Sequence, residues 1–387
     1  MTTRLTILLF CLAKLTGFSQ QADTTRLSLV FAGDIMGHDE QITGAYDAAT
    51  NSYNYEPTFR YVKPYIEKAD IAIANFEVTL AGKPYKGYPQ FSSPDALAFA
   101  ARDAGFDIFL QANNHALDRG KAGFARTLTM LDSLNIIHSG TFTSNEDRSK
   151  NHPLIVEKNN IRIALLNYTY GTNGIVIQPP LIINRIDTAL IRRDLNKARL
   201  ANPDFIIACM HWGDEYQRVE NQGQRKLAAF ILKHGADAII GSHPHVVQPV
   251  KLYPDMADTT RKKIVVYSQG NFVSNQRAQY KDGGIMVELN LLKTKETTRV
   301  EDFSYMPTWV FRDDLSGKST FYIVPVAYYE NNTLRFGFKD HDRYKISLFA
   351  KDTREHLKNV KESEFFAGTK DEGQETRDKG QETSVSE

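Results

Sequence analysis

Short apolar runs recur along the chain, and each is followed by polar or glycine-rich residues and then by a stretch with helical spacing. The runs are rich in Ile, Val and Phe and occupy residues 27–31, 71–74, 107–110, 161–166, 205–210, 238–240 and 264–267. Continuous apolar runs of this length are typical of strands that are buried on both faces. Helices are expected between them, over residues 93–105, 120–134, 187–200 and 222–234. The alternation predicts a layered α/β domain.

The composition changes towards both ends of the chain. Residues 1–19 combine a positive start, an apolar stretch and small residues near Gln20, as a cleavable secretory signal does. The main domain is expected over residues 20–292, and a β-rich C-terminal addition over 293–361, where strand-like runs at 320–326 and 334–338 have no clear helix between them. Residues 362–387 lack apolar periodicity and are expected to form a disordered tail. We therefore expect an exported protein, in the periplasm or at the cell surface.

Charge and cysteine content exclude several classes of protein. The formal net charge is +1, so no basic excess points to a nucleic-acid partner. After removal of residues 1–19 only Cys209 remains, and an intramolecular disulfide is then impossible. We also expect no thiolate zinc site, because Cys209 is predicted to point inward from its strand.

Polar side chains follow most of the predicted strands at the point where each strand ends. These residues are Asp34, Asn75, Glu77, Asn114, His115, His211, His243, His245 and Asn271. Ligands of open α/β sheets bind outside the carboxyl ends of the strands, so we expect these side chains at one edge. Imidazole together with carboxylate and amide oxygen suits one or two divalent ions of Mn, Zn or Fe. A single residue of this kind would indicate only a turn or a helix cap.

His243-Pro244-His245 is the sharpest local element. Alternate side chains of an extended segment point the same way, and the proline stiffens the backbone between the two histidines. The pattern predicts that both imidazoles reach one metal ion or two adjacent ions. The alternative is a turn with incidental histidines.

Residues 113–118, Asn-Asn-His-Ala-Leu-Asp, form a second module. We expect a turn that projects an asparagine oxygen towards the metal and leaves His115 beside the substrate. Asp118 would then hold the His115 ring in one tautomer. The alternative is an asparagine that caps a helix, followed by an exposed histidine.

Taken together, these motifs resemble the CapA proteins of poly-γ-glutamate capsule biosynthesis, which share the calcineurin-like metallophosphatase fold. The similar segments are Phe-Ala-Gly-Asp34-Ile-Met, Asn75-Phe-Glu77, Asn113-Asn114-His115-Ala-Leu-Asp118, His211-Trp-Gly, Gly241-Ser-His243-Pro-His245-Val-Val-Gln and Tyr267-Ser-Gln-Gly-Asn271-Phe272. They follow the order of the family over most of the folded chain.

The resemblance implies a four-layer αββα sandwich with metals at the strand ends, here with the small β-rich C-terminal addition. The ligands that it implies are Asp34, Glu77, Asn114, His211, His243 and His245, and the catalytic pair is His115 and Asp118. The broader metallophosphatases have Asp-x-His at the first strand, whereas this chain has Met36 at the third position. His38 lies near but at a different spacing. Glu77, rather than Asn75, is expected to take the place of the superfamily's bridging aspartate.

The resemblance also implies a role in poly-γ-glutamate synthesis, export or surface attachment, with metal-assisted hydrolysis as the chemistry. The expected partners are an anionic polymer such as poly-γ-glutamate, or a phosphate-ester substrate, and a membrane-bound synthesis complex. Two other functions stay open: a general exported metallophosphoesterase, and a polymer-binding subunit in which the metal is only structural.

Overall fold

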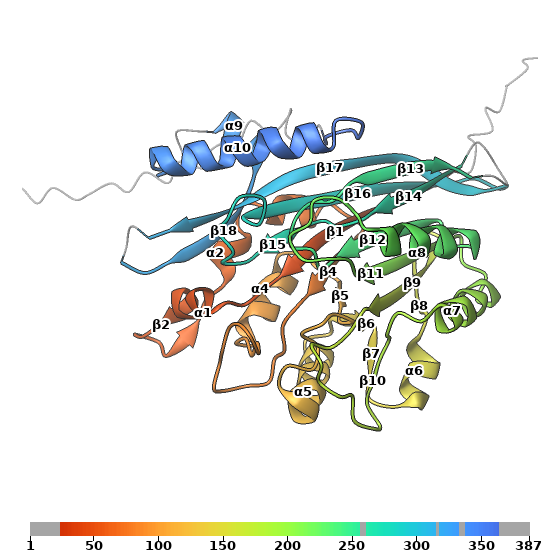
Figure 1. Ribbon diagram of the computed structural model, residues 1–387, viewed down its shortest axis with the longest axis horizontal. Helices are drawn as coiled ribbons and strands as arrows, with labels where there is room; N and C mark the ends of the chain where they lie inside the picture. Colours follow the sequence, from red (N-terminus) through yellow and green to blue (C-terminus); the bar gives the residue numbers. More distant parts are fainter. Residues whose placement is uncertain (1–23, 256–260, 315–316, 333–336, 364–387) are drawn as a thin grey trace, which may run out of the picture.

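The computed structural model describes residues 24–255, 261–314, 317–332 and 337–363 (Figure 1). The predicted signal segment and residues 364–387 of the predicted tail lie outside these ranges. The predicted apolar runs all form strands. None of the helices in the described ranges is both long and apolar enough to cross a lipid bilayer.

Two sheets form the centre of the molecule. The first contains, in spatial order, β18 (Thr320–Pro325), β17 (Thr298–Asp313), β16 (Gly283–Lys293), β1 (Thr25–Ile35), β4 (Ile71–Phe76), β5 (Ile108–Leu110) and β6 (Ile137–Ser139), and β15 (Asn271–Val273) also pairs with β1. The second contains β13 (Val250–Pro254), β14 (Lys262–Val266), β12 (Ala238–Ser242), β11 (Phe205–His211), β9 (Ile161–Thr169) and β8 (Leu154–Lys158). Two short pairs, β2 (Tyr46–Asp47) with β3 (Ser52–Tyr53) and β7 (Thr141–Phe142) with β10 (Ile182–Ile183), lie outside both sheets.

The two sheets pack face to face through a continuous apolar core. Phe31 and Ile73 of the first sheet belong to the same buried cluster as Ile207, Cys209 and Ile240 of the second. Cys209 thus points inward, as predicted, and burial raises the pKa of its thiol. Strands buried on both faces explain why these segments are continuous apolar runs rather than alternating ones.

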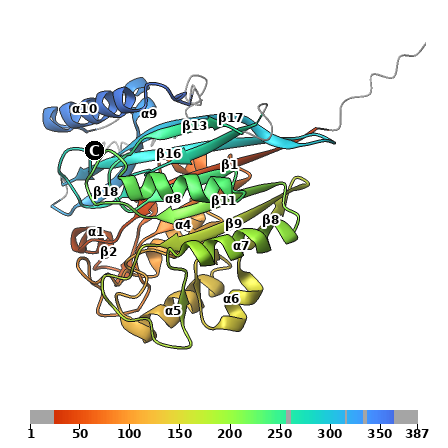
Figure 2. The ribbon, with the colours of Figure 1, turned by 45° about the vertical axis from the view of Figure 1, so that its right-hand side comes forward.

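Helices cover the outer faces of both sheets. On the first sheet lie α2 (Glu56–Phe59), α3 (Lys63–Ile66) and α4 (Ala96–Asp103), and on the second α7 (Thr188–Leu200) and α8 (Gln222–Lys233). Figure 2 shows α7 and α8 in front of β9 and β11. The remaining helices before the C-terminal addition are α1 (Asp39–Ala45), α5 (Gly120–Ser133) and α6 (Asn145–Asn151). The predicted α/β fold, a four-layer αββα sandwich, is confirmed.

Side-chain caps mark the starts of α7 and α8. The Asp187 side chain accepts from the Leu190 N–H at 2.7 Å at the start of α7, and Asn221 accepts from the Gln224 N–H at 2.8 Å at the start of α8. Side-chain oxygens satisfy free N–H groups at these positions. The helix expected from residue 93 begins later, at Ala96 of α4, and the Ser93 hydroxyl caps no N–H group, since it has no hydrogen-bond partner among the described residues.

The C-terminal addition contains helices that the sequence interpretation missed. β17 and β18 extend the first sheet, as expected, but α9 (Val326–Asn331) and α10 (Asp340–His356) follow them. Of the strand expected over 334–338, residues 337 and 338 are not in a strand, and 334–336 lie outside the described ranges. α10 packs on Trp309 and Phe311, which share a face of β17 with Tyr305 of the core between the sheets. The helix therefore covers the part of that face that the second sheet leaves open (Figure 1).

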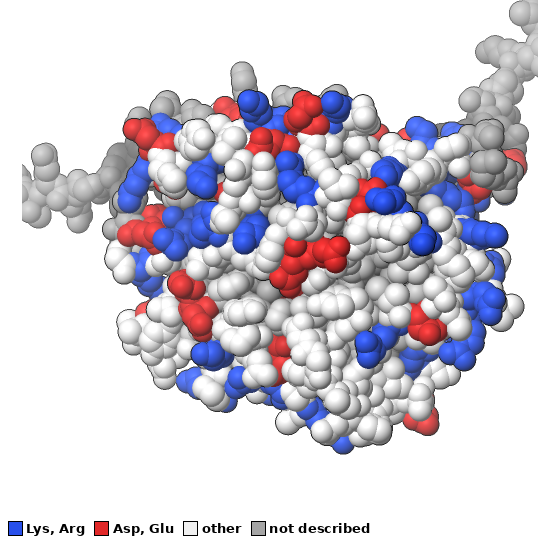
Figure 3. Space-filling model, in the orientation of Figure 1, with Lys and Arg blue, Asp and Glu red and all other residues white. Residues whose placement is uncertain are grey.

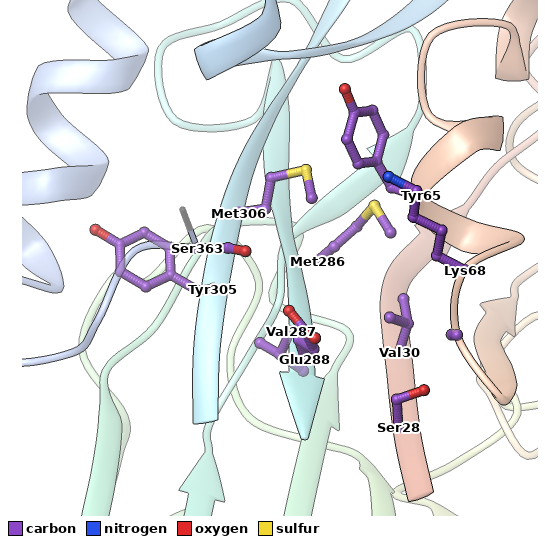
Figure 4. A pocket seen from close by; sticks show the side chains of 11 residues that line it. Ser28, Val30, Tyr65, Lys68, Met286, Val287, Glu288, Tyr305, Met306 and Ser363 are labelled. Carbon is purple, nitrogen blue, oxygen red and sulfur yellow. The ribbon is translucent and has the colours of Figure 1, made fainter. Parts of the chain in front are cut away.

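One apolar cavity lies on the outer face of the first sheet. Its volume is about 50 Å³, and its lining includes Val30, Tyr65, Met286 and Met306 (Figure 4). Tyr65 and Lys68 approach it from one side and Met306 from the other. None of the polar residues predicted to bind a metal lines this cavity.

Candidate metal centre

The predicted metal ligands converge from two sheets rather than from the edge of one. Asp34 lies near the end of β1, Glu77 follows β4, and His211 is the last residue of β11. His243 and His245 follow β12. All five side chains are buried. The carboxyl ends of these strands meet where the two sheets face each other, and this explains why residues far apart in the chain become neighbours.

A local irregularity in β1 aims Asp34 into this centre. The pairing of β1 with β4 shifts register between Ala32 and Asp34, as at a β-bulge. A Cβ atom at Gly33 would lie 2.0 Å from the carbonyl oxygen of Gly270. Only glycine allows this close approach of the two backbones, so the Gly-Asp sequence is needed to place the carboxylate.

Asp34, Glu77 and His245 form the first metal group. His245 Nδ1 lies 2.9 Å from Asp34 Oδ2, and His245 Nε2 lies 3.8 Å from Glu77 Oε1. One ligand atom from each residue lies within 4.8 Å of the others. Two carboxylates and one imidazole are suitable ligands for a divalent transition metal.

Glu77, His211 and His243 form the second metal group, on the same distance criterion. His211 Nε2 lies 3.5 Å from Glu77 Oε1, and the His211 and His243 ring centroids are 4.8 Å apart. Glu77 therefore belongs to both groups. It occupies the place that the sequence interpretation gave to a bridging carboxylate.

The residues present fit a bound cation on electrostatic grounds. Burial and the neighbouring Asp34 charge raise the pKa of Glu77, while burial and the other imidazoles lower the pKa of His211. Burial lowers the pKa of His243 to about 3. Glu77 Oε1 and His243 Nδ1 are buried and have no hydrogen-bond partner among the described residues. Buried polar atoms are rarely left unpaired, so these two atoms are suited to coordinate a metal ion.

Two asparagines support the groups. Asn75 Nδ2 donates to Asp34 Oδ1 at 2.7 Å and to Glu77 Oε2 at 2.9 Å, and it thereby fixes both carboxylates. Asn114 Oδ1 lies 2.7 Å from His211 Nε2, beside the second metal group. The structure thus brings all six predicted ligands together, and their binding of a metal stays a prediction.

His115 and Asp118 form a buried pair next to Asn114. His115 Nδ1 lies 2.7 Å from Asp118 Oδ2, and the same oxygen accepts from the Phe91 N–H at 2.8 Å. The Phe91 ring meets the His115 ring edge-on, with centroids 4.7 Å apart. Burial raises the pKa of Asp118. The contact holds the imidazole in one orientation. The role of His115 in proton exchange stays a prediction.

Comparison with known proteins assigns the chain to a family. A family model described as "Bacterial capsule synthesis protein PGA_cap" matches residues 28–276. The chain belongs to this family. It is 28% identical over 269 residues to the capsule biosynthesis protein CapA of Bacillus anthracis, covering 66% of this chain and 61% of that protein. It is also 28% identical over 317 residues to the PGA biosynthesis protein CapA of Bacillus subtilis (strain 168), covering 76% of each.

The chain spans only about three fifths of the length of the first of these two relatives. Among solved structures, the NAD nucleotidase NadN of Haemophilus influenzae is 13% identical with a TM-score of 0.47, and the match covers 86% of this chain and 68% of that one. The calcineurin-like phosphoesterase YfkN of Bacillus subtilis is 14% identical with a TM-score of 0.42, and the match covers 87% of this chain and 99% of that one. Similarities at this level say nothing about the chemistry of the PGA_cap chain.

The backbone at His243-Pro244-His245 corrects one prediction. This segment of the PGA_cap chain is not a strand: His243 has φ 98° and His245 has φ 57°. Side chains larger than glycine rarely adopt such angles, which cost about 1–3 kcal/mol each and concentrate at functional sites. The two rings consequently serve different metal groups, with centroids 6.1 Å apart. A strained turn, rather than strand alternation, directs them.

Three nearby residues of the PGA_cap chain, Ser242, Tyr170 and Asn173, were not predicted to be in the site. Ser242 Oγ lies 3.0 Å from His211 Nδ1, and the Tyr170 ring lies 4.5 Å from the His243 ring. Asn173 Oδ1 accepts from Asn114 Nδ2 at 3.1 Å. Asn271 Nδ2 donates to the His245 carbonyl at 3.3 Å. Asn271 was already expected at this edge, and Ser242 lies inside a quoted motif, so the sequence could have suggested it. No sequence signal marks Tyr170 or Asn173.

His38 does not belong to either metal group. Its Nδ1 lies 3.2 Å from Gln41 Oε1 and 3.3 Å from the Asn275 backbone nitrogen, which donates to it. Burial lowers the pKa of His38. The residue therefore orders the start of α1 rather than replacing the imidazole that is missing at Met36.

Proposed function

We propose that this chain is an exported, metal-dependent hydrolase of capsule biosynthesis that acts on an anionic polymer, poly-γ-glutamate. The observation that carries the proposal is the position of Glu77 in both metal groups. Two divalent cations could share this carboxylate, while Asn114 connects His211 to the adjacent His115–Asp118 pair. The name of the Bacillus subtilis relative, a PGA biosynthesis protein, supports the choice of polymer, since the motifs resemble the CapA proteins of poly-γ-glutamate capsule biosynthesis.

Asp34, Glu77, His211, His243 and His245 would hold a divalent cation, which, when bound, would lower the pKa of a water and polarise the scissile group. The residues of this chain exchange the proton and position the carboxylates. Asp118 Oδ2 accepts the hydrogen bond of His115 Nδ1–H, so His115 Nε2 is the atom that exchanges a proton with the substrate. In hydrolysis it gives this proton to the leaving group as water adds across the bond. Asn75 holds the two carboxylates in place throughout.

The test begins with elemental analysis of the purified protein, which gives the identity and number of bound metals. Hydrolysis of poly-γ-glutamate and of a generic phosphodiester is then measured with added Mn, Zn or Fe. Metal-dependent cleavage of the polymer supports the proposal. Cleavage of the phosphodiester alone favours a general metallophosphoesterase. If neither is cleaved but the polymer binds, the chain is a polymer-binding subunit.

Export rests on residues 1–19 and has its own experiment. After expression in a Gram-negative host, the protein should occur outside the cytoplasm with an N-terminus near Gln20. Mass spectrometry of soluble cytoplasmic protein that still carries Met1 would contradict export without affecting the metal proposal.

A further inference from the structure

Three exposed tyrosines lie around the candidate metal centre, and we call them the tyrosine rim. Tyr170 follows β9 and is 41% exposed, Tyr216 lies in the loop after β11 and is 44% exposed, and Tyr88 lies between β4 and α4 and is 68% exposed. A single exposed aromatic side chain needs no explanation. Several around one site indicate a surface that binds a ligand.

Tyr170 and Tyr216 each lie beside a different histidine of the metal centre. The Tyr170 ring centroid is 4.5 Å from that of His243, and the Tyr216 ring centroid is 6.1 Å from that of His245. The two histidine rings are themselves 6.1 Å apart. Tyr170 therefore lies beside the second metal group and Tyr216 beside the first.

Tyr88 lies beside the His115–Asp118 pair. Its ring centroid is 6.4 Å from that of Phe91, and the Phe91 ring is in turn 4.7 Å from the His115 ring. Burial, Glu215 and Tyr88 raise the pKa of Tyr216 to about 12, so Tyr88 also lies near Tyr216. The rim thus has a member next to each part of the predicted site.

Backbone hydrogen bonds hold two members of the rim against the metal ligands. The Tyr170 N–H donates to the His211 carbonyl at 3.0 Å, and the Tyr216 N–H donates to the Pro244 carbonyl at 2.8 Å. Tyr216 has φ 65°, a conformation that persists only where the surroundings enforce it. Lys281 Nζ lies 4.0 Å from the centroid of its ring. Rings fixed in this way bind a ligand with little loss of side-chain freedom.

Charge does not select the ligand of the rim. Asp214 and Glu215 directly precede Tyr216 in the chain, whereas the cation of Lys281 lies over the Tyr216 ring. Figure 3 shows acidic and basic side chains interspersed over the surface. Such a surface offers an anion no consistent attraction. The exposed faces of the tyrosine rings are uncharged, so we expect them to contact an uncharged part of a substrate.

We propose that the tyrosine rim binds the uncharged backbone of an amide-linked polymer, with Tyr170 and Tyr216 on the two sides of the bond that lies at the metal groups. The proposal rests on the proposed function, which supplies poly-γ-glutamate as the polymer. Between its carboxylates this chain has methylene groups and an amide, and both pack against aromatic faces. Rings beside two different metal groups fit a substrate that extends past both of them.

The experiment measures binding of fluorescently labelled poly-γ-glutamate to the metal-loaded full chain by anisotropy, at times before any cleavage. Tyr88→Ala, Tyr170→Ala and Tyr216→Ala should each weaken binding about threefold to tenfold. In the Tyr170→Ala, Tyr216→Ala double variant the two factors should multiply, because the rings contact separate parts of the chain. Phenylalanine at each position keeps the ring and should bind as the wild type does.

Tyr344→Ala is the matched control, because Tyr344 is a tyrosine of α10 that is 63% exposed and belongs to neither metal group. It should bind the polymer as the wild type does. Metal content should be unchanged in every variant. Lost polymer binding with intact metal therefore supports the rim even if no hydrolysis is found.

Polyphosphate and salt separate ring contact from charge. Polyphosphate is anionic but has no methylene or amide, so the alanine variants should bind it as the wild type does. Their loss of poly-γ-glutamate binding should be the same at low and high salt, because salt screens charges and not ring contacts. The rim is overturned if the wild type does not bind the polymer, if the alanine variants bind it equally well, if the phenylalanine variants lose as much, or if the loss disappears at high salt or extends to polyphosphate. These outcomes hold whatever the hydrolysis assay shows.

Discussion

Two buried clusters in this chain combine histidine with carboxylate, yet they differ in how completely their polar atoms are paired. One consists of the two metal groups. The other, the His152 network, contains Arg148, His152, Tyr168, Asn184 and Asp194. In the network, Asp194 Oδ2 accepts from Arg148 Nη2 at 2.6 Å and from the Tyr168 hydroxyl at 2.8 Å, and it lies 3.1 Å from His152 Nε2. None of the buried side-chain nitrogen and oxygen atoms of these five residues lacks a hydrogen-bond partner.

The metal groups show the opposite condition. Two carboxylates are buried there without an arginine or lysine partner in the described ranges, and Glu77 Oε1 and His243 Nδ1 are unpaired. Burying charge without compensation is costly. In the network, Arg148 compensates the negative charge of Asp194. Both clusters contain histidine and carboxylate, but only in the metal groups do buried polar atoms lack partners among the described residues. Residue type alone therefore does not reveal a site.

The largest expected effect is on metal binding after Glu77→Gln. The amide removes the one carboxylate that both metal groups share, so both should lose their metal, by about 100-fold or more in affinity. Without metal, the variant should be at least as stable as the wild type, because a buried uncompensated charge has been removed. Elemental analysis and urea unfolding measure the two effects.

Glu288→Gln is the control for this change, because Glu288 lies on β16 outside both metal groups and bonds to Asn290. It should keep the wild-type metal content. Full metal content in Glu77→Gln would show that Glu77 is not a ligand, and the contrast between the two clusters would lose its main support.

His115→Ala should keep the metal and lower turnover by about 10²–10⁴-fold, because a proton donor is removed while the ligands remain. Asp118→Asn should also lower turnover, since it disturbs the tautomer of His115. His138→Ala is the matched control: His138 Nε2 lies 3.1 Å from Asp132 Oδ1, in a similar pair outside the site. Loss of metal in His115→Ala would instead make His115 a ligand.

The parts of the fold that could be predicted are those where local sequence and tertiary packing agree. The central strands are buried on both faces, so they appear as apolar runs. α10 was missed because most of its residues are polar. Its buried residues Ile346, Phe349, Ala350 and Thr353 nevertheless have the spacing of one helical face, so the signal was present but weak.

The candidate metal centre likewise has one part that could be predicted from the sequence and one that could not. The residue types at the strand ends were enough to predict which side chains meet, because parallel strands place their carboxyl ends together. The membership of His243 and His245 in different metal groups could not be predicted. It depends on positive φ angles and on the bond from the Tyr216 N–H to Pro244, a contact between segments distant in sequence.

Asp194→Asn should have its effect on stability rather than on metal. The change weakens a buried ion pair and leaves the Arg148 charge uncompensated, which costs about 3–5 kcal/mol of unfolding free energy. Urea unfolding measures the loss, and elemental analysis should find the wild-type metal content. Asp132→Asn, in an exposed pair with His138, should change stability by less than about 1 kcal/mol. If Asp194→Asn released the metal while stability stayed constant, the network would be part of the site.

The smallest expected effect is the pH dependence of the stabilisation that the ionised Asp194 carboxylate provides. Burial alone would raise the pKa of Asp194, but its contacts with His152, Arg148 and Tyr168 outweigh burial and lower it from 3.8 to about 2. Because the folded pKa is the lower one, the stabilisation is complete above the unfolded value and disappears as the pH falls through the folded value. The shift corresponds to about 2 kcal/mol. The difference in unfolding free energy between wild type and Asp194→Asn should therefore shrink by about that amount between pH 5 and pH 2. A constant difference over this range would mean that Asp194 is not ionised in the folded protein, and that the network, like the metal groups, lacks full compensation of charge.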